Sequence, residues 1–144
     1  MPTVELRFSA VPAHVRTARL IASTVGRRSG LDESLVDEVR LAVGEACARA
    51  VGVQQAHGVT EEVVVTFADD EGTFAVTVAD HGQAEAEADL ADLIDAAAGL
   101  DGTLPIGFGL AVIAGLVDDL EVTSNGDGTV VRMCWPLLVP SSSS

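Results

Sequence analysis

The sequence contains no lysine, and basic residues are scarce overall. Its 144 residues include eight basic and 22 acidic side chains, which gives a formal net charge of −14. Binding to nucleic acid depends on lysine and arginine side chains that replace the counterions of the phosphate backbone. This composition therefore argues against a protein that binds nucleic acid directly.

Cysteine and long apolar runs are also scarce. Cys47 and Cys134 are the two cysteines, and they do not form a CxxC motif. Neither a disulfide scaffold nor a cysteine-based zinc site is expected, which suits a reducing compartment. No apolar run approaches the roughly 20 residues that span a bilayer, and no signal peptide is recognisable. We expect a cytoplasmic protein that does not enter a membrane.

The few basic residues are concentrated in the first third of the chain. Residues 1–49 hold seven arginines against six acidic residues, whereas residues 50–144 hold only Arg132 against 16 acidic residues. Two interpretations remain open. The arginines form a docking face for an acidic partner, or they only neutralise one end of an acidic surface.

Hydrophobic periodicity predicts two successive helices after a first strand. One helix begins near Pro12 and ends at Gly30, and the next begins at the capping residue Asp32 and runs to about Gly52. The first helix is expected to bury Val15, Ala18, Ile21, Ala22 and Val25, and to carry Arg16, Arg19, Ser23 and Arg27 on its opposite face. In the second, Leu35, Val39, Val43, Ala46, Ala50 and Val51 are expected to oppose a stripe of Glu38, Ala42, Glu45 and Arg49.

The remaining patterns complete a two-layer domain. Strands are predicted over residues 4–10, 61–68, 73–80, 120–123 and 129–135, and a third helix over residues 110–117. These elements predict an α/β two-layer sandwich, with one mixed, mainly antiparallel sheet covered by helices on one face. Residues 1–137 are expected to form this single domain. Residues 83–106 are expected to form a mobile lid, and residues 138–144 a disordered tail.

Three short motifs follow one another in an order that suits a nucleotide site. Glu45 and Arg49 lie one turn apart on a predicted helix, Asp80-His81-Gly82 follows a strand, and Gly107-Phe108-Gly109 opens a helix. A helix N-terminus offers free N–H groups to phosphate, and a carboxylate can accept the amino group of a purine. Each motif alone is typical of a surface pair, a turn or a helix cap, but their order makes the set more specific.

With these motifs the chain resembles the Bergerat-type ATP-binding fold of the GHKL superfamily. Within it, the chain resembles the RsbW/SpoIIAB type of bacterial anti-sigma factor, which doubles as a serine kinase. The resemblance covers nearly all of residues 3–137. Residues 41–51 (LAVGEACARAV) resemble the N-box helix, residues 78–82 (VADHG) the adenine-binding box, and residues 107–113 (GFGLAVI) the second glycine box.

This resemblance implies roles for residues of the nucleotide site. Glu45 occupies the position of the catalytic base, and Asp80 the position that binds adenine. Gly82, Gly107 and Gly109 occupy positions of the nucleotide loops, and Thr129 lies toward the purine pocket. ATP or ADP is the implied ligand.

The resemblance also implies protein partners. These are an alternative sigma factor, a STAS-domain anti-anti-sigma protein and a second copy of the chain. Arg19 matches an arginine of the N-terminal helix that such anti-sigma factors use against both partners, and Arg16 lies on the same predicted face. We therefore assign Arg16 and Arg19 to partner binding.

Arg49 departs from the family pattern, because the family's kinases carry an asparagine there that helps to hold Mg²⁺. Magnesium prefers oxygen ligands, whereas a guanidinium has five donors and no acceptor. Arg49 either pairs with Glu45 and silences the catalytic site, or contacts phosphate directly so that nucleotide binds without Mg²⁺. We expect no metal site, little effect of Mg²⁺ and weak or absent kinase activity.

Three hypotheses for function follow. The first is an anti-sigma factor that sequesters a sigma factor and is released by a STAS-domain protein. The second is an active ATP-dependent kinase that phosphorylates a serine or threonine of that STAS partner. The third is a degenerate domain that mediates protein contacts outside sigma control. Arg49 favours the first hypothesis over the second.

Overall fold

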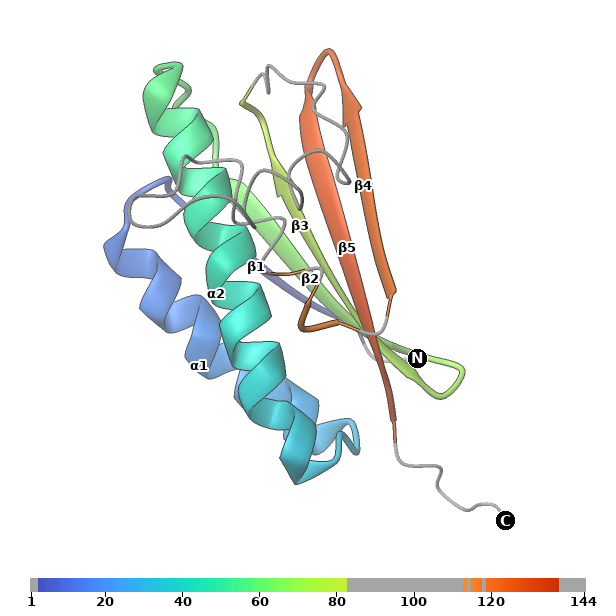
Figure 1. The fold of residues 1–144 in the computed structure, drawn as a ribbon. Coiled ribbons are helices and arrows are strands. Elements are labelled where there is room, and N and C mark those ends of the chain that lie inside the picture. The colour runs from blue at the N-terminus through green and yellow to red at the C-terminus, as the bar shows by residue number, and fades with distance from the viewer. Residues whose placement is uncertain (1–2, 83–112, 114, 118, 138–144) are drawn as a thin grey trace.

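Two helices cover one face of a five-stranded sheet in a computed structural model that describes residues 3–82, 113, 115–117 and 119–137 (Figure 1). The strand order is β1-β2-β3-β5-β4, and every neighbouring pair is antiparallel. The predicted two-layer α/β sandwich with a mainly antiparallel sheet is confirmed. The elements are β1 (Thr3–Phe8), α1 (Ala13–Arg28), α2 (Glu33–Ala56), β2 (Val63–Asp70), β3 (Thr73–Asp80), β4 (Asp119–Asn125) and β5 (Gly128–Pro136).

The two hairpins of the sheet form at the predicted turns. Glu71 and Gly72 connect β2 to β3 with φ angles of 51° and 82°, which suit the right-handed twist of an antiparallel pair. β2 begins and ends two residues later than predicted, so that Asp69 and Asp70 extend the ladder instead of forming the turn. β4 and β5 are joined by a tight turn between Asn125 and Gly128, in the gap between the two predicted strands.

Helix α1 ends as predicted, but one of its side chains faces the other way. Gly30 has a φ of 98°, and the Leu31 amide donates to the Gly26 carbonyl at 2.9 Å, which is a Schellman cap. Pro12 directly precedes the helix instead of starting it. Ser23 was expected beside the arginines but is buried, and its hydroxyl is satisfied there because it donates to the Leu20 carbonyl of its own helix.

Helix α2 begins at the predicted cap and continues one turn beyond the predicted end. The carboxylate of Asp32 accepts from the Ser34 amide at 3.4 Å. Gly52 does not end the helix, since Val53 and Gln54 on the next turn are buried and keep it packed. The stripe expected to face away from the core is also partly buried, and Arg49 lies within it.

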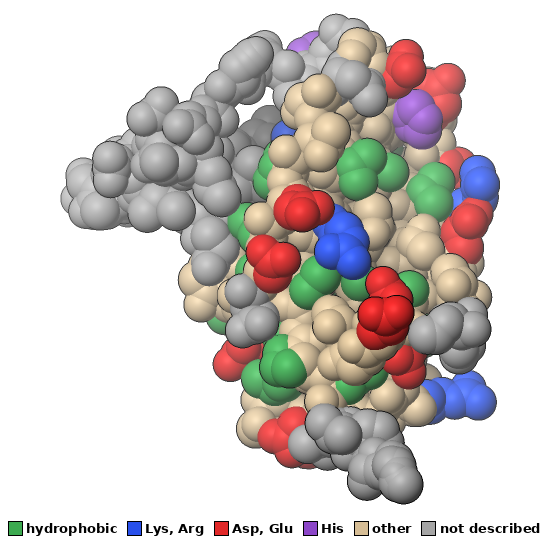
Figure 2. Space-filling model, turned by 90° about the vertical axis from the view of Figure 1, so that its right-hand side faces the viewer, with side chains coloured by type: hydrophobic (Ala, Val, Ile, Leu, Met, Phe, Trp, Pro, Cys, Tyr) green, Lys and Arg blue, Asp and Glu red, His purple; other side chains and the backbone are tan. Residues whose placement is uncertain are grey.

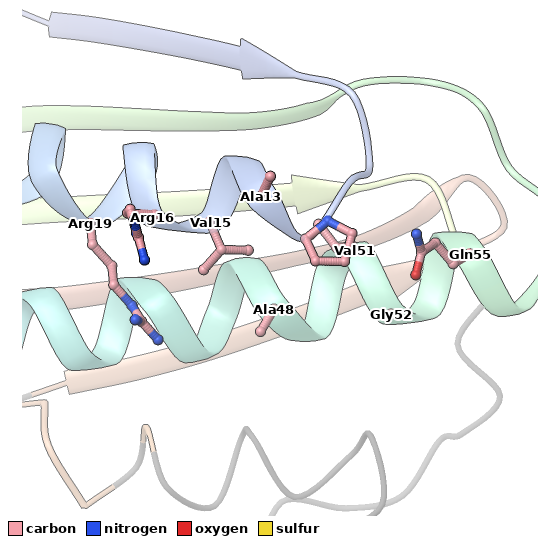
Figure 3. A pocket seen from close by; sticks show the side chains of 9 residues that line it. Ala13, Val15, Arg16, Arg19, Ala48, Val51, Gly52 and Gln55 are labelled. Carbon is pink, nitrogen blue, oxygen red and sulfur yellow. The ribbon is translucent and has the colours of Figure 1, made fainter.

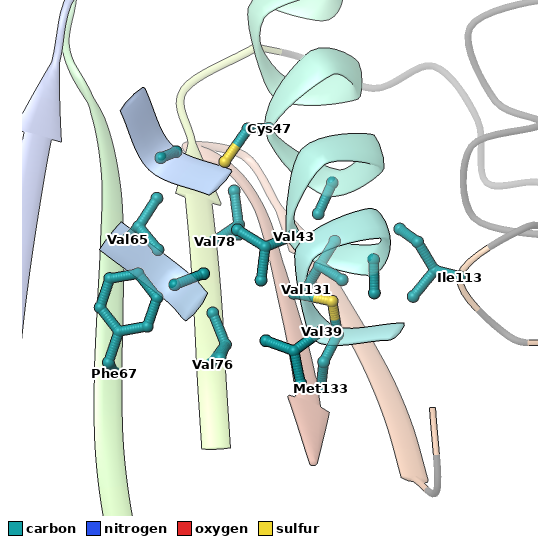
Figure 4. Close-up of a cluster of buried hydrophobic side chains, with 14 of the residues drawn as sticks. Val39, Val43, Cys47, Val65, Phe67, Val76, Val78, Ile113, Val131 and Met133 are labelled. Carbon is teal, nitrogen blue, oxygen red and sulfur yellow. The ribbon is translucent and has the colours of Figure 1, made fainter. Parts of the chain in front are cut away.

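The core lies between α2 and the three central strands (Figure 4). Val39 and Val43 of α2 belong to one buried cluster with Phe67 of β2, Val76 of β3 and Met133 of β5. Burying side chains of this size contributes about 1.5–3 kcal/mol each. Cys47 belongs to the same cluster, and burial raises the pKa of its thiol to about 12. Cys47 therefore serves as a small packing residue of the core.

The opposite face of the sheet is not covered by α1 or α2. Its central side chains include Thr66, Thr77 and Arg132, which alternate along the strands with buried valines. Figure 2 looks toward this side, where acidic, hydrophobic and uncharged side chains are interspersed. None of the helices within the described ranges is long and apolar enough to cross a lipid bilayer.

Three of the predictions concern residues that the structure does not describe. They are the lid over residues 83–106, most of the helix over residues 110–117, and the tail over residues 138–144. Gly107 and Gly109 also lie outside the described residues. Ile113 is described and is buried in the core.

Candidate functional site

The Asp80-His81-Gly82 motif lies at the end of β3, beside the C-terminal half of α2. Arg49 donates through Nη1 to Oδ2 of Asp80 at 3.0 Å, and the Gly82 amide donates to Oδ1 of the same carboxylate at 2.9 Å. The side chains of Arg49 and Asp80 are only 7% and 1% exposed. The motif that was expected to receive a purine is therefore bound to the chain's own arginine.

Arg49 does not pair with Glu45, which was one of the two interpretations suggested by the sequence. Among the described residues its ion pair is with Asp80, 31 positions away, and not with Glu45 one turn earlier on α2. Glu45 is partly buried. The Nε atom of Arg49 is buried and has no hydrogen-bond partner, so the guanidinium is only partly satisfied.

Two further residues of α2 fasten the rest of the motif. Gln54 is fully buried; its Oε1 accepts from the His81 amide at 2.8 Å, and its Nε2 donates to the Glu61 carbonyl at 2.7 Å. Gly82 packs against Val53, because a Cβ added to Gly82 would lie 2.2 Å from Cγ1 of Val53. Each residue of the motif thus has its own contact on α2, at positions 49, 53 and 54. Gln54 was not identified from the sequence as a site residue. The only available signal was its position on the buried side of α2.

Strand β5 closes the other side of Asp80. Thr129 is buried directly opposite Asp80 in the β3–β5 ladder, and its amide donates to the Asp80 carboxylate. The Thr129 hydroxyl lies 3.1 Å from that of Ser124. A Cβ at Gly128 would lie 1.9 Å from the Asp80 carbonyl oxygen, so only glycine fits this close approach. The structure therefore brings together Arg49, Asp80, Gly82 and Thr129.

Opposing forces act on the Asp80 carboxyl. Burial raises its pKa above the ordinary 3.8, while the Arg49 charge and the Gly82 and Thr129 amides favour the ionised form. Arg49 thus supplies the countercharge that a buried carboxylate needs. Arg49 and the two amides together engage three of the about four lone-pair sites of the carboxylate.

The described residues do not fit a magnesium ion. The position that would supply an amide oxygen carries Arg49, which has no acceptor and is positively charged. No magnesium-dependent step can be built on these residues.

A second candidate surface lies between α1 and α2, around Arg16 and Arg19 (Figure 3). Both arginines line a hollow of about 720 Å³, whose floor includes Val15, Ala48 and Val51. Ion pairs among the described residues involve Arg7, Arg27, Arg40 and Arg49, but neither Arg16 nor Arg19. Arg27, which was predicted to share their face, is paired with Glu33 at 3.0 Å.

Comparison with known proteins finds one family and a set of relatives. Residues 8–135 match the histidine kinase-like ATPase domain. The chain is 32% identical to serine-protein kinase RsbW of Bacillus pumilus, over 88% of this chain and 82% of that protein. It is 29% identical to serine-protein kinase RsbW of Bacillus subtilis, over 90% of this chain and 82% of that protein.

A solved structure has the same fold. The RsbU and RsbW domains of a Mycobacterium tuberculosis protein superpose with a TM-score of 0.69 at 22% identity. The match covers 97% of this chain, which spans 34% of that longer chain.

Proposed function

The chain belongs to the histidine kinase-like ATPase domain family, as a member of its RsbW type, and from this premise we propose that it acts as an anti-sigma factor in the cytoplasm. In this role it sequesters an alternative sigma factor and is released when a STAS-domain anti-anti-sigma protein competes for it. The protein works through binding by a folded scaffold, and it forms a homodimer.

The observation that carries this proposal is the buried pair between Arg49 and Asp80. It supports a binding protein over a kinase, because the carboxylate expected to hold adenine is already occupied by an internal cation. Because arginine stands where the family's kinases carry asparagine, this position has no amide oxygen to offer Mg²⁺. We propose that ATP or ADP binds weakly and gains little from Mg²⁺.

Arg16 and Arg19 support the choice of partner surface. They line a hollow between the helices and make no ion pair with the described residues. In a chain of net charge −14, this surface can attract acidic side chains of a partner. An arginine also fixes the orientation of the partner, since its planar guanidinium forms two parallel hydrogen bonds with a carboxylate.

The second candidate function is ATP-dependent phosphorylation of the STAS partner. It is favoured by the relatives, which are named serine-protein kinases, and by Glu45, which occupies the position of the base on α2. In that case Mg·ATP would have to displace Arg49 from Asp80 before any phosphate transfer.

One experiment separates the two functions. The purified chain is titrated with each alternative sigma factor and each STAS-domain protein encoded in the same genome, first without nucleotide and then with Mg·ATP. The proposal predicts that a sigma factor binds without nucleotide, that a STAS protein displaces it, and that no phosphate is transferred. A sigma complex that forms only with Mg·ATP, or a STAS protein phosphorylated at serine, would favour the kinase.

A further inference from the structure

Arg19 of α1 lies directly across Gly44 of α2. A Cβ built on Gly44 would lie 2.1 Å from Nε of Arg19 and 2.9 Å from both Cζ and Nη2. These are the three nearest atoms, so the missing side chain of Gly44 is replaced by one guanidinium. Figure 3 shows Arg19 reaching from α1 over α2.

Nothing else among the described residues holds this guanidinium. Arg19 makes no hydrogen bond or ion pair there, whereas Arg40 on the same surface is tied to Asp37 at 3.4 Å. Hollows of about 720 and 560 Å³ lie on either side of Arg19. Arg19 therefore lies between two hollows and directly against Gly44.

We propose that Gly44 is a positioning residue for partner binding. By leaving space on α2, it seats the Arg19 guanidinium so that its remaining donors meet a carboxylate of an acidic partner segment. This inference rests on the proposed function, because it assigns a geometric role to the partner surface around Arg19.

The reason lies in the difference between attraction and orientation. A displaced Arg19 keeps its charge and still attracts an acidic surface, but a paired hydrogen bond needs the planar fork at a fixed angle. An alanine at position 44 would push away the flexible end of Arg19 and not the helix backbone. The helix itself would not suffer, because alanine has a higher helix propensity than glycine.

The test compares Gly44→Ala with Arg19→Ala and Arg40→Ala in the full chain. The first readout needs no partner: the Nε–Hε resonance of Arg19 in a nitrogen–proton NMR spectrum, assigned by its loss in Arg19→Ala. We expect Gly44→Ala to shift this resonance while Arg40→Ala leaves it in place. The thermal midpoint of Gly44→Ala should equal or exceed that of the unaltered protein.

The second readout is affinity for whichever sigma factor or STAS-domain protein binds the unaltered chain. Gly44→Ala should weaken it about fivefold or more, approaching the effect of Arg19→Ala. An unshifted Arg19 resonance, an unchanged affinity, or a fall in thermal midpoint that explains the lost affinity would each overturn the role of Gly44. If no such protein binds the unaltered chain, the proposed function fails, and the resonance alone decides whether Gly44 seats Arg19.

Discussion

Arg49 and Asp80 form a buried ion pair that joins α2 to the end of β3, with 3.0 Å between Nη1 and Oδ2. In the family pattern, these two positions serve a magnesium ion and a purine. In this structure the two side chains are instead paired with each other. We propose that the pair makes these two residues a structural contact in place of ligand-binding residues, and the predictions on stability and ATP binding below follow from this proposal.

Removing both partners of the pair should cost less free energy of unfolding than the two single removals added together. Arg49→Leu leaves a buried carboxylate without its countercharge, and Asp80→Asn leaves a buried guanidinium. Each single change is expected to lower the free energy of unfolding by about 3–5 kcal/mol. The double variant should lose clearly less than the sum, since no unpaired charge remains. Urea unfolding of the unaltered protein, the two single variants and the double variant gives a double-mutant cycle. Additive losses would mean that the two side chains are not coupled.

The Asp80 carboxyl should titrate above its ordinary pKa of 3.8, because burial outweighs the donors around it. A raised pKa in the folded state means that the native protein binds this proton more tightly than the unfolded chain does. The contribution of Asp80 to the free energy of unfolding is therefore full below the unfolded pKa and is lost as pH rises through the folded pKa.

Carbon NMR of the carboxyl group measures this titration directly. Arg49→Leu should raise the pKa of Asp80 further, because it removes a charge that favours the ionised form. Arg40→Leu, which removes an exposed arginine elsewhere on α2, should leave it unchanged. A midpoint at or below 3.8 in the unaltered protein would contradict the dominance of burial.

The comparison between sequence and structure shows where pattern reasoning reaches its limit. The strands and two of the helix ends were predictable because they depend on neighbours along the chain, such as Asp32 capping α2 or Gly30 closing α1. The contact between Arg49 and Asp80 was not, because helical spacing points only to Glu45 as a neighbour of Arg49. A pairing across 31 positions depends on how α2 lies over the sheet. The seating of Arg19 on Gly44 was hidden for the same reason.

Gln54 should be important for stability although it has no expected role in binding. Its amide joins the His81 amide to the Glu61 carbonyl, and both of these backbone groups lose this partner in Gln54→Ala. We expect a loss of about 1–3 kcal/mol in the free energy of unfolding. Gln55→Ala is the matched control, since Gln55 is exposed. Equal effects of the two substitutions in thermal or urea unfolding would argue against a stabilising role of the two Gln54 hydrogen bonds.

Arg19 should matter for binding and not for stability. Arg19→Ala is expected to weaken binding to a sigma factor or STAS-domain protein by about 1–3 kcal/mol, the range for losing a charge-assisted contact. The thermal midpoint should stay close to that of the unaltered protein, because Arg19 is exposed and makes no ion pair with the described residues. Unchanged affinity, or a collapse of the fold, would reject Arg19 as a docking residue.

Our main proposal is that the Arg49–Asp80 ion pair stands where a nucleotide site is expected. Calorimetric titration with ATP, with and without Mg²⁺, is the most direct test of this proposal. The unaltered protein should bind ATP weakly and equally in both conditions, since Arg49 occupies Asp80 and offers no oxygen to the metal. Arg49→Asn should bind ATP more tightly and only then depend on Mg²⁺, while Arg40→Asn should behave like the unaltered protein. Tight, magnesium-dependent binding of ATP to the unaltered protein would show that Arg49 does not close this site.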